Sequence, residues 1–391
     1  MSTLDAIVVG AGVAGLACAR RLRKHGLAVR VLEAEDGVGG RVRTDEVEGF
    51  RLDRGFQVLP VAYPEAQEAL DYARLRLQPF ERGAIVRFQG RLHRIADPRK
   101  SPLSGLRGLR SGMFGVRDAV AVARVLRRRG SETTALEALR EAGLSETAID
   151  AFFAPFLRGI FLEPELATSS LFLEFVLGTF SSGAASIPYR GMGAIAEQLS
   201  EGLDVRTGSP VAEVAPGSVR TESGETVVAR AVVVATSGLI DEPAAGWNGV
   251  GCLYFDAPEP PIRGAWLVLD GDGGGVVNNL CTLTEVSRGY GPPGRSLVSV
   301  SVIGPGEPDA DAVLRELGDW FGPRVREWRS LGTYTITQAL PAFPVGTVLE
   351  LPARLASGLY ACGDHRAHPS LNGALFSGRL AADAVLDDLV V

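Results

Sequence analysis

The chain has very little lysine, few cysteines and no long apolar run, and each shortage excludes something. Only Lys24 and Lys100 stand among its 40 basic residues, a bias typical of a GC-rich bacterial genome. The four cysteines are widely separated and form no C-x-x-C pair, so neither a metal site nor a disulfide framework is expected, and a reducing cytoplasm fits best. No run of about 18 apolar residues occurs, so no transmembrane helix is predicted.

The overall composition is typical of a globular protein and gives no sign of a nucleic-acid partner. Apolar residues make up 46% and charged residues 22% of the 391 positions, and the net charge is −6. This length suits two or three folded units with a substantial core.

The first 33 residues have the pattern of a βαβ unit. The apolar segment 6–10 predicts a strand, a helix-like run ends at Lys24, and a second apolar strand covers 28–32. Between the first strand and the helix stands GAGVAG, a G-x-G-x-x-G sequence. In this context the pattern indicates a dinucleotide-binding turn rather than an ordinary glycine-rich loop.

Each glycine of that turn has a physical role. Gly10 allows a tight turn, Gly12 allows a pyrophosphate to approach the backbone, and Gly15 allows close packing of helix on strand. The helix N-terminus offers free N–H groups to phosphate. Glu33, at the end of the second strand, can accept hydrogen bonds from a ribose, and its charge would repel the 2′-phosphate of NADP.

The rest of the chain alternates between helical and strand-like patterns. Helices are expected at 116–129, 132–142, 146–156, 310–321 and 373–386, and loops or short helices at 101–115. Strands are expected at 203–206, 210–214, 219–221, 226–229, 231–235, 252–255, 265–269, 296–303 and 358–362. We therefore predict a discontinuous α/β nucleotide-binding domain of residues 1–60, 190–240 and 355–391, and a substrate domain of residues 61–189 and 241–354.

Further glycine-containing motifs follow the first one. In GVGGRVRT the paired glycines Gly39 and Gly40 would let the backbone approach phosphate, and Arg41 offers a forked set of donors. Residues 52–57 read LDRGFQ. Near the C-terminus a predicted strand ends in Gly363-Asp364, and NGALFSG follows it.

Together these blocks resemble FAD-dependent oxidoreductases of the amine oxidase, phytoene desaturase and protoporphyrinogen oxidase superfamily. The resemblance extends to the P-x-x-G-M segment at 188–192 and to the strand at 231–236. It implies a Rossmann-type, glutathione-reductase-like domain that binds FAD without a covalent bond, and an inserted α+β substrate domain.

The resemblance also implies which residues bind FAD: Gly10, Gly12, Gly15, Glu33, Gly39, Gly40, Arg41, Gly55, Phe56, Gln57, Val211, Gly363, Asp364, Asn372, Gly373 and Ala374. In this interpretation Arg41 lies along the phosphates, the backbone of Val211 meets adenine, and Asp364 binds near the ribityl chain. The segments 55–57 and 372–374 approach the flavin ring. Each position could instead be a structural turn or strand end.

Three departures from the resemblance bear on the reaction. Many amine oxidases of this group place a lysine near the flavin, but Lys24 and Lys100 stand in the first helix and a basic loop. The stretch before the C-terminal glycine, 369–372, has no aromatic residue. No second nucleotide fingerprint occurs, so we expect O2 or a quinone, rather than a bound nicotinamide, to accept the electrons.

Two inserted segments suggest the nature of the substrate. Residues 151–180 are rich in large apolar side chains, which fits either a packed core or a cavity for a lipophilic molecule. Residues 82–129 contain 13 Arg or Lys among apolar residues, which fits either a solvated helix face or peripheral contact with an anionic membrane.

We predict hydride transfer from a C–H bond of a carotenoid- or isoprenoid-like substrate to flavin N5, of desaturase or oxidase type. His365 and His368 are candidates for proton transfer, or alternatively brace their loop. The remaining candidates for the substrate site are Arg158, Tyr189, Arg190 and Met192. The sequence leaves open a flavin-dependent isomerase without net redox change, an amine oxidase, and a non-catalytic flavin-binding module.

Overall fold

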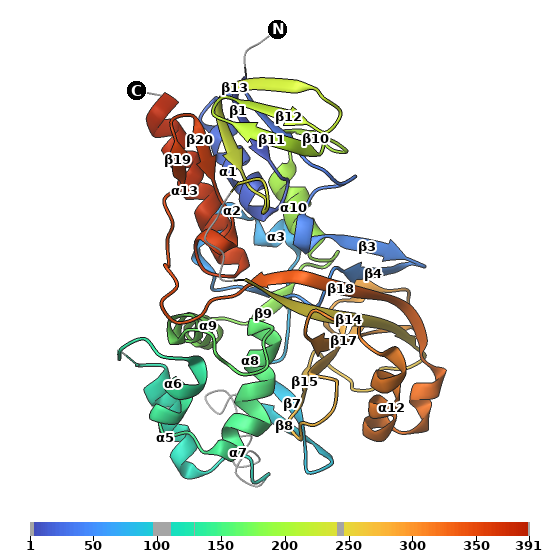
Figure 1. Cartoon of the computed structure of the whole chain (residues 1–391). Helices are drawn as coiled ribbons and strands as arrows, with labels where there is room; N and C mark the ends of the chain where they lie inside the picture. The colour runs from blue at the N-terminus through green and yellow to red at the C-terminus, as the bar shows by residue number, and fades with distance from the viewer. Residues whose placement is uncertain (1–3, 97–110, 129, 241–245, 390–391) are drawn as a thin grey trace.

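The computed structural model describes residues 4–96, 111–128, 130–240 and 246–389, and it contains two large sheets with helices packed against them (Figure 1). In Figure 1 the first sheet lies near the two chain ends, and the second lies at the far end of the molecule beside a group of helices. This mixed α/β architecture confirms the predicted fold class.

The first sheet is the nucleotide-binding type of sheet that the N-terminal pattern predicts. Its order is β10-β2-β1-β13-β12-β11, and β20 adds to it by pairing with β13 and β19. The strands β10, β2, β1, β13 and β20 run parallel. The bounds are β1 Leu4–Val9, β2 Val29–Leu32, β10 Asp204–Arg206, β11 Val211–Ala215, β12 Ser218–Thr221, β13 Thr226–Val234, β19 Arg354–Ala356 and β20 Leu359–Ala361.

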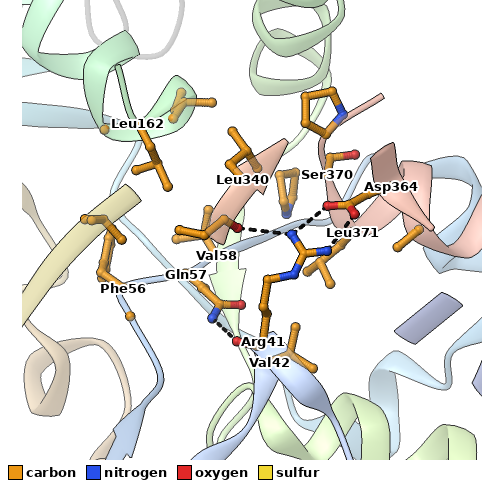
Figure 2. Close-up of a pocket in the computed structure, with 18 of the residues that line it drawn as sticks. Arg41, Val42, Phe56, Gln57, Val58, Leu162, Leu340, Asp364, Ser370 and Leu371 are labelled. Carbon is orange, nitrogen blue, oxygen red and sulfur yellow. Dashed lines mark hydrogen bonds and ion pairs between the residues drawn. The ribbon is translucent and has the colours of Figure 1, made fainter. Parts of the chain in front are cut away.

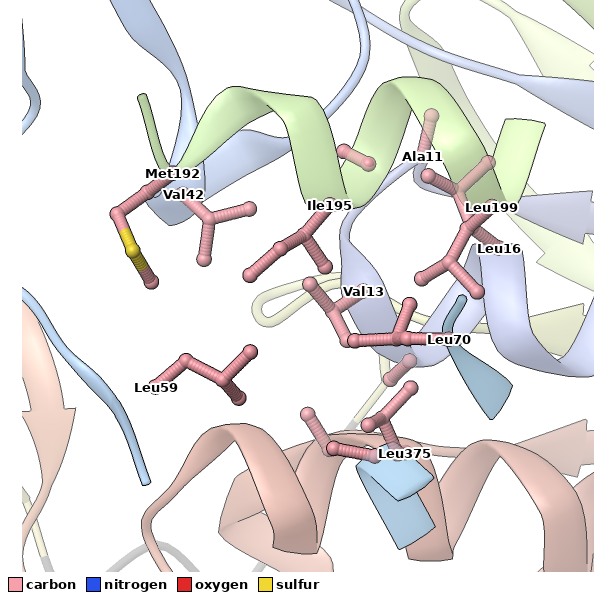
Figure 3. Close-up of a cluster of buried hydrophobic side chains, with 14 of the residues drawn as sticks. Ala11, Val13, Leu16, Val42, Leu59, Leu70, Met192, Ile195, Leu199 and Leu375 are labelled. Atoms are coloured by element: carbon pink, nitrogen blue, oxygen red, sulfur yellow. The ribbon is translucent and has the colours of Figure 1, made fainter. Parts of the chain in front are cut away.

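Three helices pack together with this sheet: α1 (Val13–Lys24), α10 (Gly193–Ser200) and α13 (Leu371–Leu389). Figure 3 shows Leu16 of α1, Ile195 of α10 and Leu375 of α13 pointing into one apolar cluster. All three side chains are buried because each helix presents one apolar face to the cluster. Met192, which precedes α10, points into the same cluster (Figure 3).

The second sheet has the order β18-β14-β17-β16-β15-β7-β8, and its only parallel pair within the described residues is β15 with β7. Val313 and Leu317 of α12 (Ala310–Phe321) pack on Leu253 and Val298 of this sheet. The bounds are β7 Gly83–Phe88, β8 Arg91–Ala96, β14 Trp247–Ala257, β15 Leu267–Asp270, β16 Asn279–Thr282, β17 Ser296–Ile303 and β18 Arg329–Pro341.

The helical group follows the predicted periodicity with one irregularity. It consists of α5 Val116–Val125, α6 Ala135–Glu141, α7 Glu146–Ala148, the π-helix η2 Ile149–Phe153, α8 Ala154–Phe161 and α9 Ser170–Ser182. Pro155 has no N–H to donate to the carbonyl of Ala151, so the regular α-helical ladder cannot continue through this point. The predicted helix 146–156 is therefore three short segments in succession.

The smaller elements connect these layers: η1 Gly40–Val42, β3 Thr44–Val47, β4 Phe50–Asp53, β5 Leu59–Pro60, α2 Pro64–Ala69, α3 Tyr72–Leu75, β6 Gln78–Pro79, β9 Ala185–Ile187, α11 Leu283–Val286, η3 Arg288–Tyr290, η4 Pro323–Glu327 and η5 Asp364–Arg366. The strands of the two large sheets follow the two predicted residue sets, except that β19 begins at Arg354, one residue before the predicted limit at 355. The domain limits stay a prediction. Most of the loop predicted at 101–115, Lys100 and part of the basic segment 82–129 lie outside the described residues.

Candidate active site

A cavity of about 830 Å³ extends between the two large sheets. We call one part the nucleotide half, which is lined by Gly10, Gly12, Val13, Ala14, Glu33, Ala34, Glu35, Gly39, Gly40, Arg41, Val42, Ala235, Thr236, Ser237, Gly363, Asp364 and His365. We call the other the apolar half, which is lined by Phe152, Pro155, Phe156, Gly159, Ile160, Leu162, Phe172, Val176, Phe180, Leu267, Leu269, Asn279 and Ser301. The segment Gly55–Val58 lines the cavity between them, together with Ile336, Ser370, Leu371 and Ala374.

The glycines of the first turn differ in what a side chain would meet. A Cβ on Gly12 would meet nothing within 4 Å, although Gly12 lines the cavity, so it would project into open space. A Cβ on Gly15 would lie 2.1 Å from the carbonyl oxygen of Gly10. Gly15 therefore packs the helix on the strand and does not line the cavity, as the third glycine of such a turn should.

Glu33 lines the nucleotide half of the cavity. Its side chain is 8% exposed, and its Oε2 accepts a hydrogen bond of 2.6 Å from the backbone N–H of Ala11. Oε1 accepts one of 2.9 Å from the backbone N–H of Glu35. A carboxylate oxygen has more than one acceptor site, so the anchored group can still receive ribose hydroxyls.

Gly39 and Gly40 bring a second turn against the first. Gly39 forms a bridge to Gly12, and a Cβ on Gly40 would lie 3.7 Å from the Cα of Gly12. Gly39 has a φ of 120°, a conformation that side chains rarely adopt. The two turns thus form a side-chain-free cradle whose size and chemistry fit a pyrophosphate.

Arg41 and Asp364 form an ion pair in the lining of the nucleotide half (Figure 2). The guanidinium donates to both carboxylate oxygens, over 2.9 and 2.6 Å, and to the carbonyl oxygen of Ala339 over 3.1 Å. Burial lowers the pKa of Arg41, but the adjacent Asp364 outweighs it, so the net pKa is raised. Two groups predicted to bind different parts of FAD therefore hold one another in a forked ion pair.

The segment predicted to approach the flavin ring does line the cavity. Gly55, Phe56 and Gln57 are all on its wall, and Gln57 Nε2 donates to the carbonyl oxygen of Arg41 over 2.6 Å (Figure 2). A Cβ on Gly55 would lie 2.8 Å from Cδ1 of Ile336, so β18 of the second sheet closes directly over this segment.

Four of the predicted FAD residues do not line the cavity: Gly15, Val211, Asn372 and Gly373. Asn372 instead accepts a hydrogen bond of 3.0 Å from the backbone N–H of Glu65. A Cβ on Gly373 would lie 1.9 Å from the carbonyl oxygen of His368, so Gly373 permits a tight turn before α13. Of the segment 372–374, only Ala374 reaches the wall of the cavity.

The two candidate histidines have different surroundings. His365 lines the cavity, with Nδ1 4.0 Å from Oδ1 of Asp364. His368 does not line it; its ring lies 4.2 Å from the ring of Phe175, and Nδ1 lies 2.9 Å from Oγ of Ser370. Burial lowers the pKa of His368 to about 4, so this imidazole is neutral near pH 7. The structure thus favours the bracing alternative for His368.

None of the four residues predicted for the substrate site lines the cavity. Arg158 donates to the carbonyl oxygen of Pro164, and Arg190 is exposed. The ring of Tyr189 lies under the guanidinium of Arg76, 4.0 Å from it. Met192 is a fully buried core residue.

The comparison with known proteins decides the family. A family model of flavin-containing amine oxidoreductases matches residues 13–386. The chain belongs to this family. Protoporphyrinogen oxidase 2 of Arabidopsis thaliana is 45% identical over 69 residues, which make up 18% of this chain and 14% of that protein.

Solved structures of the same fold cover the whole molecule. An oxidoreductase from Methanosarcina mazei has a TM-score of 0.74 at 18% identity, over 98% of this chain and 100% of that one. Cyclohexylamine oxidase from Brevibacterium oxydans IH-35A has a TM-score of 0.71 at 17% identity, over 100% of both chains. These structures confirm the predicted fold, and the family model confirms the predicted superfamily of flavin-dependent oxidoreductases.

The residues of the nucleotide half fit the flavin cofactor of this family. The open space at Gly12, the anchored Glu33 and the Arg41–Asp364 pair provide places for pyrophosphate, ribose and polar linker groups. Within the described residues no group of three His, Cys, Asp or Glu could hold a metal ion. No helix in the described part of the chain is long and apolar enough to cross a membrane.

Several lining residues escaped sequence analysis. Trp247, Asn279, Ser301 and Ile336 come from four strands of the second sheet, and Tyr63 comes from the start of α2. None of them stands in a local motif, so no signal in a single sequence could have found them. Tyr63 and Trp247 also bring aromatic rings to the cavity that the segment 369–372 lacks.

Proposed function

We propose that this enzyme oxidises a C–H bond of a neutral, lipophilic, isoprenoid-like substrate. The observation that supports this most is the apolar half of the cavity, which is continuous with the nucleotide half and carries phenylalanine and aliphatic side chains. The residues named for the apolar half carry no charge, and Glu81 and Arg82 line the cavity beside it, next to Ala84, the strand partner of Leu267. An apolar wall of this kind suits a ligand without charge.

Bound FAD would supply the redox chemistry by taking a hydride from the substrate. The chain would bind and orient both molecules: the glycine cradle and Glu33 hold the nucleotide, and the phenylalanines exclude water. His365 is the imidazole that lines the cavity, so it is our candidate for moving a proton. O2 or a quinone would then accept the electrons.

Amine oxidation has less support. Among the described residues no lysine lines the cavity, since Lys24 lies exposed at the end of α1. A protonated amine would also enter a half whose named lining residues are uncharged, and burying an unpaired charge is costly.

A membrane could deliver such a substrate, and we propose α5 as a contact with anionic lipid. Its exposed residues include Arg117, Arg124 and the apolar Val120, which is 51% exposed. Leu126 follows the helix and is 43% exposed. Co-sedimentation with phosphatidylglycerol vesicles should fall for Val120→Glu and Leu126→Glu together; binding equal to that of the parent protein would refute this contact.

The reaction is tested by anaerobic flavin reduction. The FAD-loaded protein is mixed separately with phytoene, cyclohexylamine and putrescine, and the oxidised flavin absorbance is followed. We expect only the carotenoid to bleach it; bleaching by the amines alone would refute the proposal. Turnover that requires pre-reduced flavin and consumes no acceptor would instead show the isomerase, and the reoxidation rate in air or with a quinone identifies the acceptor.

A further inference from the structure

Two neutral polar side chains interrupt the wall of the apolar half. Asn279 on β16 and Ser301 on β17 are register partners, so both project from the same face of the sheet. Both line the cavity, although Asn279 is only 3% and Ser301 only 4% exposed. Buried polar groups in an apolar wall are costly unless they are hydrogen-bonded.

The pair is held in place but retains hydrogen-bonding capacity. Asn279 Nδ2 donates to Oγ of Ser301 over 3.2 Å, and Asn278 Nδ2 donates to Oδ1 of Asn279 over 2.9 Å. The same Asn278 amide donates to the carbonyl oxygen of Pro155, which ties the pair to α8. In the described part of the chain, neither the second N–H of Asn279 nor the hydroxyl hydrogen of Ser301 has a protein acceptor. The pair can therefore donate two hydrogen bonds into the cavity.

Gly159 of α8 keeps the helix close to this pair. It lines the cavity, and a Cβ there would lie 3.1 Å from both Asn278 Nδ2 and Asn279 Oδ1. Any larger side chain at this position would crowd the amides and fill space beside them.

The strand order of the second sheet gives the distance between the Asn279–Ser301 pair and the flavin end of the cavity. Ile336 on β18 lies against Gly55, and the order β18-β14-β17-β16 leads from it to the pair. Neighbouring strands lie about 4.8 Å apart, so two steps to β17 span about 10 Å and three steps to β16 about 14 Å. Ile303 is the β17 residue level with Ile336, and Ser301 lies two residues, about 7 Å, along the strand from it, so Ser301 and Asn279 lie about 12 and 16 Å from Ile336.

We propose that Asn279 and Ser301 bind a neutral oxygen atom, a hydroxyl or a carbonyl, of an elongated apolar substrate. That oxygen would lie about 12–16 Å from the carbon that reacts at the flavin end. The distance to the reacting carbon rests on the proposed function, whereas the binding of the oxygen does not. A neutral oxygen fits the pair better than a carboxylate or phosphate does, because the amide and the hydroxyl are uncharged donors.

The test compares two ligands that differ only in the oxygen. Geranylgeraniol and the hydrocarbon that lacks its hydroxyl are bound to FAD-loaded protein in equilibrium dialysis. We expect the parent protein to bind the alcohol about five- to tenfold more tightly, as about one net hydrogen bond gives. Ser301→Ala and Asn279→Leu should reduce this preference to within about twofold, and Ser301→Thr should keep it.

Ser299→Ala is the matched control, since Ser299 lies two residues from Ser301 on the same strand face but does not line the cavity. It should keep the preference, while FAD content and melting temperature report folding of every variant. Equal affinity of the parent for both ligands, or a preference that survives both variants, would overturn the proposal. Intact discrimination without flavin reduction by any carotenoid would refute the proposed reaction but not this site.

Discussion

The two halves of the cavity are built in different ways. The nucleotide half is made by short turns at the ends of parallel strands, with glycines where a ligand approaches and charged groups held by nearby partners. The apolar half is made by side chains from α8, α9 and three strands of the second sheet, which are far apart in the sequence. A cofactor site that depends on backbone shape leaves a local motif, whereas a substrate site made of distant side chains does not.

The largest expected effect separates two glycines of the same turn. Gly15→Ala should prevent stable folding of the nucleotide half, because its Cβ would lie 2.1 Å from a backbone oxygen. Gly12→Ala should leave the melting temperature of the apoprotein within a few degrees but weaken FAD binding at least about tenfold. Thermal unfolding and FAD titration measure the two effects.

Gly178→Ala is the control for this pair, since a Cβ there also meets nothing within 4 Å but lies on α9. Gly178→Ala should change neither the melting temperature nor the affinity for FAD much. If Gly12→Ala bound FAD like the parent, the cradle would not be the pyrophosphate site.

The two candidate histidines differ in position, because His365 lines the cavity and His368 does not. His365→Ala should slow flavin reduction by the carotenoid about 100-fold if its imidazole moves a proton. His368→Ala should leave that rate unchanged and lower the melting temperature, because His368 packs on Phe175. Stopped-flow reduction measures the rate; equal rates for the parent protein and His365→Ala would remove the proton-transfer role.

The ion pair in the nucleotide half gives a smaller effect on stability. Asp364 is 4% exposed, so Arg41→Met would leave its carboxylate buried without its forked partner. We expect the free energy of unfolding of the apoprotein to fall by about 2 kcal/mol, less than for a fully buried pair because Arg41 is partly exposed. The double variant Arg41→Met/Asp364→Asn should recover part of this loss in urea unfolding; a purely additive result would show that the pair does not couple.

The smallest expected effect is in the pH dependence of stability. Burial raises the pKa of Asp53 to about 6, although Thr44, Tyr290 and the Met192 N–H donate to it. Asp53 therefore adds its full contribution to the free energy of unfolding below its ordinary pKa of 3.8, and this contribution is lost as the pH rises through 6. The pKa of His368 is lowered from 6.5 to about 4. His368 therefore adds its full contribution to the free energy of unfolding above pH 6.5, and this contribution is lost as the pH falls through 4.

These two contributions oppose one another between pH 4 and 6, so variants should separate them. In urea unfolding, Asp53→Asn should leave stability that rises with pH over this window, and His368→Gln should leave stability that falls. The same pH profile for both variants would contradict the assignment of these pKa shifts.

Sequence reasoning found the nucleotide half better than the apolar half for a physical reason. Gly12, Glu33 and Asp364 stand at strand ends within short motifs, and all of them line the cavity. Met192 and Tyr189 stand in a family-like segment too, but tertiary packing turns them into the core and against Arg76. The apolar segment 151–180 supplies residues both to the packed core and to the cavity wall, and hydrophobic periodicity alone does not distinguish core residues from wall residues.

That the two halves form one cavity is tested most directly by the absorbance spectrum of the bound flavin. Geranylgeraniol is added to FAD-loaded protein while its binding is measured in parallel. We expect the flavin band to shift and the shift to saturate at one ligand per FAD, and we expect Gly159→Phe, which would fill the apolar half, to abolish both. A spectrum that stays unchanged while the ligand is bound would contradict a continuous cavity.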